Sequence, residues 1–300
     1  MMKNLYSREE RVFATGAVIL LAILTGVAVL PFLLITIASI TSEKSLISNG
    51  YSFAPDALSL DAYQYMLAQS KIVLRAYSVS IRVTVTGTIA SLLLVSTLAY
   101  PLSRPEFPFR RAITFFVVFT LLFNGGVVPS YIMWTRVFHL KNTIWALIVP
   151  NYLMSGFSVL LVKNYFEKAI PKDLIEAAQI DGASELTIFF RIMLPLSVPV
   201  LATVGMLTAL AYWNDWINGL YYINDPRLYG IQQLLIRILD NIQFLKSGTA
   251  AGALGSVPVD LPSTAVRMAL AVIGILPILL VFPLLQKYFI KGMVVGAIKG

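Results

Sequence analysis

The chain has 300 residues, 58% of them hydrophobic and 13% charged, which is typical of membrane proteins because soluble domains are nearer half apolar and a quarter charged. The absence of cysteine excludes disulfides and thiolate metal sites, and His139, the only histidine, leaves little material for a proton relay or a metal cluster. In membrane proteins, lysine and arginine are concentrated in cytoplasmic loops, where they set the orientation of the chain. The formal net charge of +8 therefore does not indicate nucleic-acid binding.

Six runs of the sequence are long and apolar enough to cross a bilayer, which requires about 20 mostly apolar residues. They lie at about 12–40, 76–101, 112–133, 142–162, 199–223 and 266–287. No polar domain separates these runs, so we expect an all-α membrane protein with six transmembrane helices and a single domain over residues 1–300. The first run is longer than the apolar region of a secretory signal, and we interpret it as a retained anchor.

The lysines and arginines indicate on which side of the membrane each loop lies. The short turn after the second run carries Arg104, Arg110 and Arg111, and short loops weigh most in the positive-inside rule. This turn favours a cytoplasmic N-terminus, and an even number of spans returns the C-terminus to the cytoplasm. We therefore expect a cytoplasmic loop over residues 163–198 and an outer loop over residues 224–264.

The predicted cytoplasmic loop contains signals for two short helices. Pro171 stands where a helix would begin, and Gly182 offers the left-handed conformation that closes one. Ser184 can cap a second helix, which would end before Pro195 at the return to the membrane. The sequence therefore predicts two helices around a glycine corner.

This corner is expected to carry a surface of small residues that another protein can approach closely. Its members are Ala177, Ala178, Gly182 and Ala183. Glu176 and Asp181 flank the surface and can accept hydrogen bonds from arginines on a partner. Two interpretations stay open on this pattern alone: a docking surface that passes on a rigid-body movement, or a simple linker helix.

Polar and aromatic residues near the later spans are candidates for the wall of a sugar pathway. Aromatic rings cover the apolar faces of pyranoses, while Asn and Asp bond the hydroxyls. The candidates are Asn124, Asn151, Tyr152, Tyr212, Trp213, Asn214, Asp215 and Trp216. An aromatic belt at the membrane interface is the alternative explanation for these rings. Arg75 and Arg82 lie two helical turns apart, where they either extend to headgroups or offer positive potential to an acidic saccharide.

Apolar residues recur at helical spacing over residues 228–245, within the predicted outer loop. Polar residues take the other face. The pattern predicts an amphipathic helix at the outer surface, lying on lipid or under a docked partner.

Several segments of the chain resemble one known family. The run EAAQIDGA at 176–183, with Pro195 downstream, closely resembles the EAA loop of bacterial ABC-importer permeases. The segments that are similar to maltose-type carbohydrate permeases are 123–131, 142–147 and 212–216, and the tail 286–300 resembles the second permease subunit of that family. The nearest resemblance is to the branch that imports polysaccharides such as alginate. It covers nearly the whole chain and implies the type I ABC importer permease fold.

In that family the EAA loop is the coupling helix that sits in a groove on a cytoplasmic ATPase. The resemblance therefore assigns ATPase coupling to Glu176, Ala177, Ala178, Asp181, Gly182, Ala183 and Pro195. The implied partners are a homologous permease subunit, two ATPase subunits and an extracytoplasmic solute-binding protein in the bacterial inner membrane. ATP and Mg²⁺ are expected on the ATPases, because this chain has no G-x-x-x-x-G-K-[ST] loop. We expect no cofactor or metal in the chain itself.

The function expected from the sequence and the resemblance is that of a permease subunit of an ATP-driven importer for oligo- or polysaccharides, and two other functions are the alternatives. An ion-coupled secondary sugar transporter would carry ionisable residues at mid-membrane and often internal repeats, and neither is visible in the sequence. A membrane enzyme would need a cluster of catalytic side chains, which the sequence also lacks. We therefore expect a transport subunit without enzymatic activity of its own.

Overall fold

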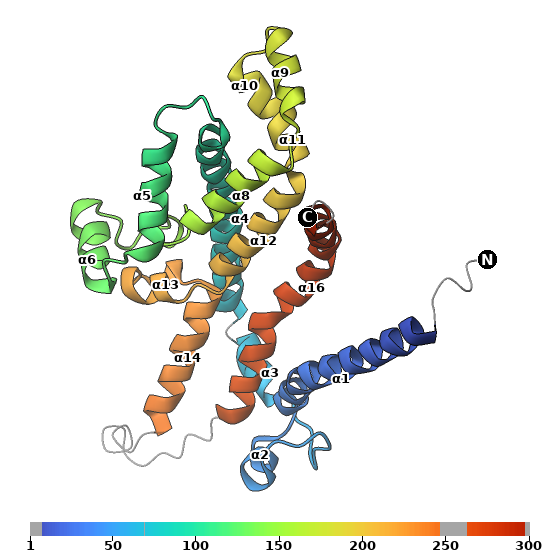
Figure 1. The fold of residues 1–300 in the computed structure, drawn as a ribbon. Helices are drawn as coiled ribbons and strands as arrows, with labels where there is room; N and C mark the ends of the chain where they lie inside the picture. Colours follow the sequence, from blue (N-terminus) through green and yellow to red (C-terminus); the bar gives the residue numbers. More distant parts are fainter. Residues whose placement is uncertain (1–7, 69, 247–262, 298–300) are drawn as a thin grey trace. The chain divides into compact units, whose positions relative to one another are not determined.

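The computed structural model describes residues 8–68, 70–246 and 263–297 (Figure 1). The described elements are helices, apart from an isolated antiparallel bridge between Thr41 and Leu58. This confirms the predicted all-α class. The chain divides into two compact units, one made of Met1–Ser70 and Leu239–Leu276 and the other of Lys71–Ile238 and Pro277–Gly300.

The first unit is built around the start of the chain. It contains α1 (Arg8–Ser39), α2 (Glu43–Asn49), α3 (Asp61–Ala68) and the first part of α16 (Ser263–Ala297). The carboxylate of Glu43 accepts hydrogen bonds from the backbone N–H groups of Thr264, at 2.9 and 3.0 Å, and of Ala265, at 2.9 Å. A negative charge here satisfies free donors and opposes the helix dipole, so Glu43 fixes the start of α16.

The second unit contains α4 (Ser70–Ser103) and the helices that follow it. These are α5 (Arg110–Leu122), α6 (Val127–Ile132), η1 (Met133–Val137), α7 (Trp145–Ile148), α8 (Gly156–Lys168), α9 (Lys172–Ile180), α10 (Glu185–Ile188), η2 (Phe189–Met193), α11 (Leu194–Leu196), α12 (Val198–Trp213), α13 (Ile217–Tyr222), η3 (Pro226–Leu228) and α14 (Ile231–Lys246), whose last residues fall in the first unit. α14 confirms that the segment predicted to form an amphipathic helix is helical.

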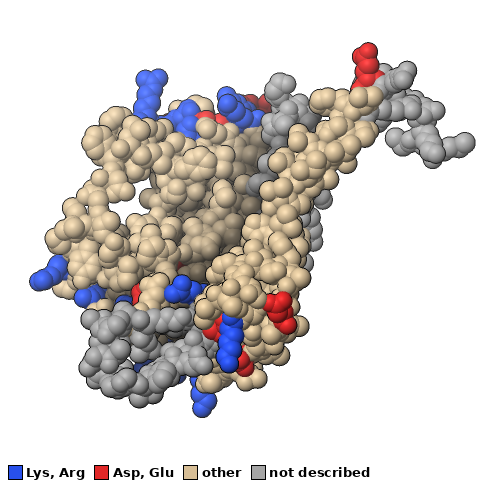
Figure 2. Space-filling model, turned by 90° about the horizontal axis from the view of Figure 1, so that it is seen from below, with Lys and Arg blue, Asp and Glu red and all other residues tan. Residues whose placement is uncertain are grey.

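Length and composition make two helices of the described chain able to cross a membrane, Val12–Ser39 and Ser70–Ser103. The described chain also has two pairs of consecutive helices that are bent at a short break. If each pair counts as one span, the number of spans rises to four. Arg110–Leu122 and Val127–Val137 bend by 115°, and Glu185–Leu196 and Val198–Trp213 bend by 76°. In Figure 2 most of the visible surface carries neither basic nor acidic side chains, as a protein surrounded by lipid requires.

Three of the predicted spans are interrupted rather than continuous helices. The run 112–133 breaks at Gly126, which has a φ of 84°, and the run 142–162 breaks after Pro150 at Asn151, which has a φ of 68°. The run 199–223 breaks between α12 and α13. Such breaks are tolerated in membranes where neighbouring groups satisfy the freed backbone atoms.

A core of packed apolar side chains holds the second unit together. Its largest fully buried members include Leu102 of α4, Val159 and Val162 of α8, Met193 of η2 and Val204 of α12. α4 and α12 come close where Gly87 faces Tyr212, since a methyl group on Gly87 would lie 2.5 Å from Tyr212 Cζ. Small residues that let helices approach are typical of membrane interfaces.

Candidate functional site

The chain after α8 folds into two short helices, α9 and α10, which we call the elbow (residues 171–188). α9 begins after Pro171, as predicted, and α10 begins after Ser184, whose Oγ accepts a hydrogen bond from Thr187 N at 3.3 Å. Ser184 therefore caps α10 in the way that the sequence indicated. Within the second unit, Figure 1 shows α9 and α10 together at one end, away from α13.

Gly182 makes the turn between the two helices. Its φ is 77°, its N–H donates to Gln179 O at 3.0 Å, and the next N–H, of Ala183, donates to Ala178 O at 2.9 Å. These two bonds are the pattern in which a glycine in the left-handed conformation closes a helix. Nothing lies within 4 Å of a methyl group placed on Gly182, so the backbone conformation alone demands glycine here.

One side of the elbow packs into the core of the second unit. Ile175 and Ala178 of α9 and Ile188 of α10 are buried there with Leu102 and Met193. The expectation that Ala178 belongs to a small-residue surface open to a partner is therefore wrong, because Ala178 is buried in this core. Ala183 is half-buried, whereas Ala177 and Gly182 are exposed.

The elbow and the start of η2 also expose large apolar side chains. Ile180 is 87% exposed and Leu186 is 70% exposed, and Phe190 and Leu174 are also exposed. Glu176 and Asp181 are also exposed, and Glu176 lines the polar cleft described below. Exposed large apolar side chains are typical of surfaces that bind a protein or a membrane. The sequence did not single out Ile180 or Leu186. Ile180 lies two positions after the buried Ala178 in α9, and this spacing puts it on another face of that helix.

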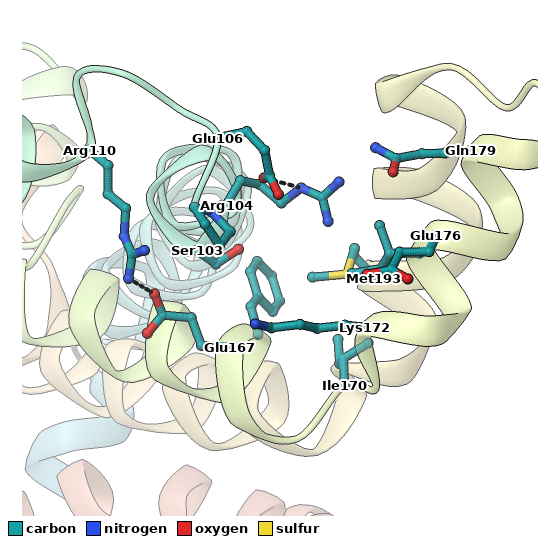
Figure 3. Close-up of a pocket in the computed structure, with 13 residues that line it drawn as sticks. Ser103, Arg104, Glu106, Arg110, Glu167, Ile170, Lys172, Glu176, Gln179 and Met193 are labelled. Atoms are coloured by element: carbon teal, nitrogen blue, oxygen red, sulfur yellow. Dashed lines mark hydrogen bonds and ion pairs between the residues drawn. The ribbon is translucent and has the colours of Figure 1, made fainter.

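A polar cleft of about 450 Å³ lies beside the elbow (Figure 3). The turn after α4 lines it on one side, and α8 and α9 line it on the other. Arg110 forms an ion pair with Glu167, which also accepts a hydrogen bond from Lys163 Nζ at 3.0 Å. Arg104 lies 3.9 Å from Glu106 and 3.6 Å from Glu185. These ion pairs link elements of this chain beside the cleft, whose lining also includes the charged side chains of Lys172 and Glu176.

Four of the residues predicted from the sequence do not lie together in one site. They are Pro195, Asn124, Asn214 and Trp216. Pro195 lies in α11, where the chain turns into α12. Asn124 Oδ1 accepts a hydrogen bond from Gly126 N at 2.8 Å and so supports the break after α5. Asn214 and Trp216 are exposed beside the break between α12 and α13.

The remaining pathway candidates pack together around that break. Tyr212 and Trp213 are buried, and the hydroxyl of Tyr212 donates to Ile148 O at 2.7 Å while its ring meets Tyr152 edge to face, with centroids 5.5 Å apart. These contacts give Tyr212 a structural role.

Asn218, which the sequence did not single out, joins the polar members of this group. Its side chain is fully buried and accepts from Asn151 Nδ2 at 2.9 Å, while its backbone N donates to Asp215 Oδ1 at 3.1 Å. Asp215 therefore satisfies a free backbone donor in the first turn of α13. Among the residues that the structure describes, no group of three or more His, Cys, Asp or Glu is placed to hold a metal ion.

Comparison with known proteins gives consistent matches. Residues 84–295 match the family described as binding-protein-dependent transport system inner membrane component. A polygalacturonan/rhamnogalacturonan transport system permease protein, YtcP of Bacillus subtilis, is 38% identical over 91% of this chain and 93% of its own length. Protein LplC of the same organism is 38% identical over 98% of this chain and 97% of its own length.

A solved structure agrees with these matches. It is a crystal structure of a bacterial ABC transporter involved in the import of the acidic polysaccharide alginate. The matched chain is 30% identical, with a TM-score of 0.78, and the match covers 96% of this chain and all of that one.

Proposed function

This chain belongs to the family of binding-protein-dependent transport system inner membrane components, and on that premise we propose that it is the membrane-spanning permease subunit of an ATP-driven importer for oligo- or polysaccharides. The observation that carries the proposal is the elbow, which buries Ile175, Ala178 and Ile188 in the core of the second unit and leaves Ile180 and Leu186 exposed. A surface of this kind receives a partner and passes its movement to the spans.

The partners proposed are a homologous permease subunit, two ATPase subunits, one of which binds the elbow, and an extracytoplasmic solute-binding protein. ATP and Mg²⁺ bind to the ATPases, and both termini of this chain lie in the cytoplasm. Support for the partners comes from the names of the relatives and from the elbow's exposed apolar surface. Ion-coupled transport finds no support among these relatives.

The proposed mechanism is alternating access, in which this chain supplies different contacts in two states and no chemistry of its own. Closure of the ATPases on ATP moves the elbow. Because Ile175, Ala178 and Ile188 are packed among α4, α8 and α12, a movement of the elbow shifts these helices as well. The transmembrane helices then rotate as rigid bodies, and the pathway opens toward the periplasmic side.

An acidic saccharide is the proposed substrate class. The names of two similar proteins mention acidic polysaccharides, polygalacturonan in one and alginate in the other. In this chain, Arg75 and Arg82 lie on one exposed face of α4. Arg82 lies 21 positions before Ser103, the last residue of α4, so the two are about 31 Å apart along the helix. The hydrocarbon core is about 30 Å thick, so this distance puts Arg82 near its outer boundary. Positive charge at an entrance raises the local concentration of carboxylates.

Uptake by the reconstituted complex tests this proposal. With its partner permease, ATPases and binding protein in liposomes, the chain should accumulate oligogalacturonate when ATP is supplied inside, and a proton or sodium gradient should not replace ATP. The double substitution Arg75→Gln and Arg82→Gln should reduce oligogalacturonate uptake about tenfold at low salt, with less effect on a neutral arabino-oligosaccharide. Uptake driven by an ion gradient without ATP would overturn the proposed function, and equal loss for both sugars would overturn the substrate class.

A further inference from the structure

The carboxylate of Glu185 joins three helices at the base of the elbow. Glu185 is the first residue of α10, and its Oε2 accepts a hydrogen bond from the hydroxyl of Tyr100 on α4. Its Oε1 accepts from Gln179 Nε2 of α9 at 3.2 Å and lies 3.6 Å from Arg104 Nη2, just beyond the end of α4. One side chain therefore connects both helices of the elbow to the end of α4.

The α4 side of this junction is held by further contacts. The ring of Tyr100 lies 5.2 Å from the ring of Phe189, which follows α10 directly, and the guanidinium of Arg104 lies 5.9 Å from the centre of the Tyr100 ring. The Arg104 side chain is only 15% exposed although it is charged. It stays in place because the ring lies beneath it and the carboxylates of Glu106 and Glu185 lie beside it.

The chemistry of the junction differs from that of the core next to it. Apolar contacts such as those of Ile175 and Ala178 are not directional, so they allow one helix to slide or rotate against another. Hydrogen bonds to a carboxylate have fixed lengths and angles, so they set the angle at which the elbow meets α4. Because the Glu185 side chain is 57% exposed and screened by water, the pair adds little to stability.

From these contacts we propose that Tyr100, Arg104 and Glu185 form a clamp that passes the movement of the elbow to α4. The proposal rests on the proposed function, because it assigns positioning residues for coupling to an ATPase. α4 is a single helix of 34 residues, about 50 Å long, and it carries Arg75 and Arg82 toward its other end. The clamp thus connects the ATPase contact to the helix that carries the proposed saccharide-attracting arginines.

Removing the carboxylate tests the clamp in the assembled complex. Glu185→Ala should lower the amount of saccharide imported per ATP hydrolysed by about fivefold or more, the smallest ratio usual for coupling between distant sites. Basal ATP hydrolysis and the thermal midpoint of the complex should stay close to those of the unchanged protein. Arg110→Gln is the matched control, because Arg110 lines the same cleft but pairs with Glu167 on α8 instead of the elbow. It should leave the import ratio unchanged.

The second test replaces the clamp by a reversible chemical cross-link between two introduced cysteines. Because the chain has no cysteine of its own, the reagent reacts only at these two positions of the chain. Arg104→Cys together with Glu185→Cys should lose coupling, regain it when a short bis-thiosulfonate joins the two thiols, and lose it again when a reductant removes the bridge. A structural side effect of the substitutions would not reverse in this way. Partner subunits without accessible cysteines are used throughout.

The outcomes separate the clamp from the proposed function. If the unchanged complex shows no ATP-driven uptake, the proposed function fails. If it transports and Glu185→Ala imports as much saccharide per ATP, or if bridging does not restore coupling, the clamp is overturned while the function stands. Loss of ATPase binding in Glu185→Ala would also overturn the clamp, since Glu185 would then act on the partner and not on α4.

Discussion

Replacing Ile180 and Leu186 of the elbow by aspartate is expected to abolish saccharide-stimulated ATP hydrolysis while the protein still inserts into the membrane. Both side chains are largely exposed in the chain alone, at 87% and 70%, so the substitutions remove nothing from its core. Burial of a large apolar side chain against a partner contributes about 1.5–3 kcal/mol, so losing two should weaken ATPase binding by a hundredfold or more. ATPase co-purification and hydrolysis rates measure this.

Leu58→Asp is the matched control for these substitutions. Leu58 is 68% exposed, and it follows α2 in the first unit, far along the chain from the elbow. The same change of an exposed apolar side chain to a carboxylate should leave ATPase binding intact there. Full saccharide stimulation in the doubly substituted elbow would show that this surface does not hold the ATPase.

The second large effect is expected from Gly182→Val. A β-branched residue strongly disfavours a φ of 77°, and the left-handed conformation costs about 1–2 kcal/mol even for ordinary residues. No neighbour lies within 4 Å to be displaced, so the chain should relieve the strain by opening the turn and reorienting α10. We expect saccharide uptake to fall at least tenfold, because a misplacement of about 1 Å in a site that depends on exact positioning can lower a rate by about a hundredfold.

Gly50→Val separates backbone strain from position. Gly50 has a φ of 73° and open space around it, as Gly182 has, but it ends α2. The ψ of Gly50 is −161°, in a region that is open almost only to glycine, so Gly50→Val should lower the thermal midpoint at least as much as Gly182→Val. Only Gly182→Val should reduce uptake. Equal loss of uptake in both variants would mean that strain itself, and not the shape of the elbow, limits transport.

The elbow was accessible to sequence analysis because its signals are local. Pro171, Gly182 and Ser184 each act on the backbone within a few residues, and the structure places a helix start, a left-handed turn and a cap at these positions. The amphipathic helix after residue 228 was predictable for the same reason, since helical periodicity is a property of neighbouring residues.

Helix continuity and side-chain partners could not be predicted in this way. An apolar run satisfies the membrane whether its helix is straight or broken, so hydropathy did not distinguish the breaks at Gly126 and Asn151 from continuous spans. The inward position of Ala178 and the pairing of Glu185 with Tyr100 depend on segments far away in sequence. Asn218 was missed because an isolated asparagine in an apolar run carries no pattern, although burial makes its hydrogen bonds obligatory.

A single cysteine at Ile180 tests the central claim most directly, because the chain has no other thiol and this side chain is 87% exposed. In the unpartnered subunit, Ile180→Cys should react with a membrane-impermeant maleimide only when the reagent reaches the cytoplasmic face. In the assembled complex, a short cross-linker should join it to the ATPase. Labelling from the outer face, or an assembled and active complex in which this cysteine never cross-links to the ATPase, would contradict the account.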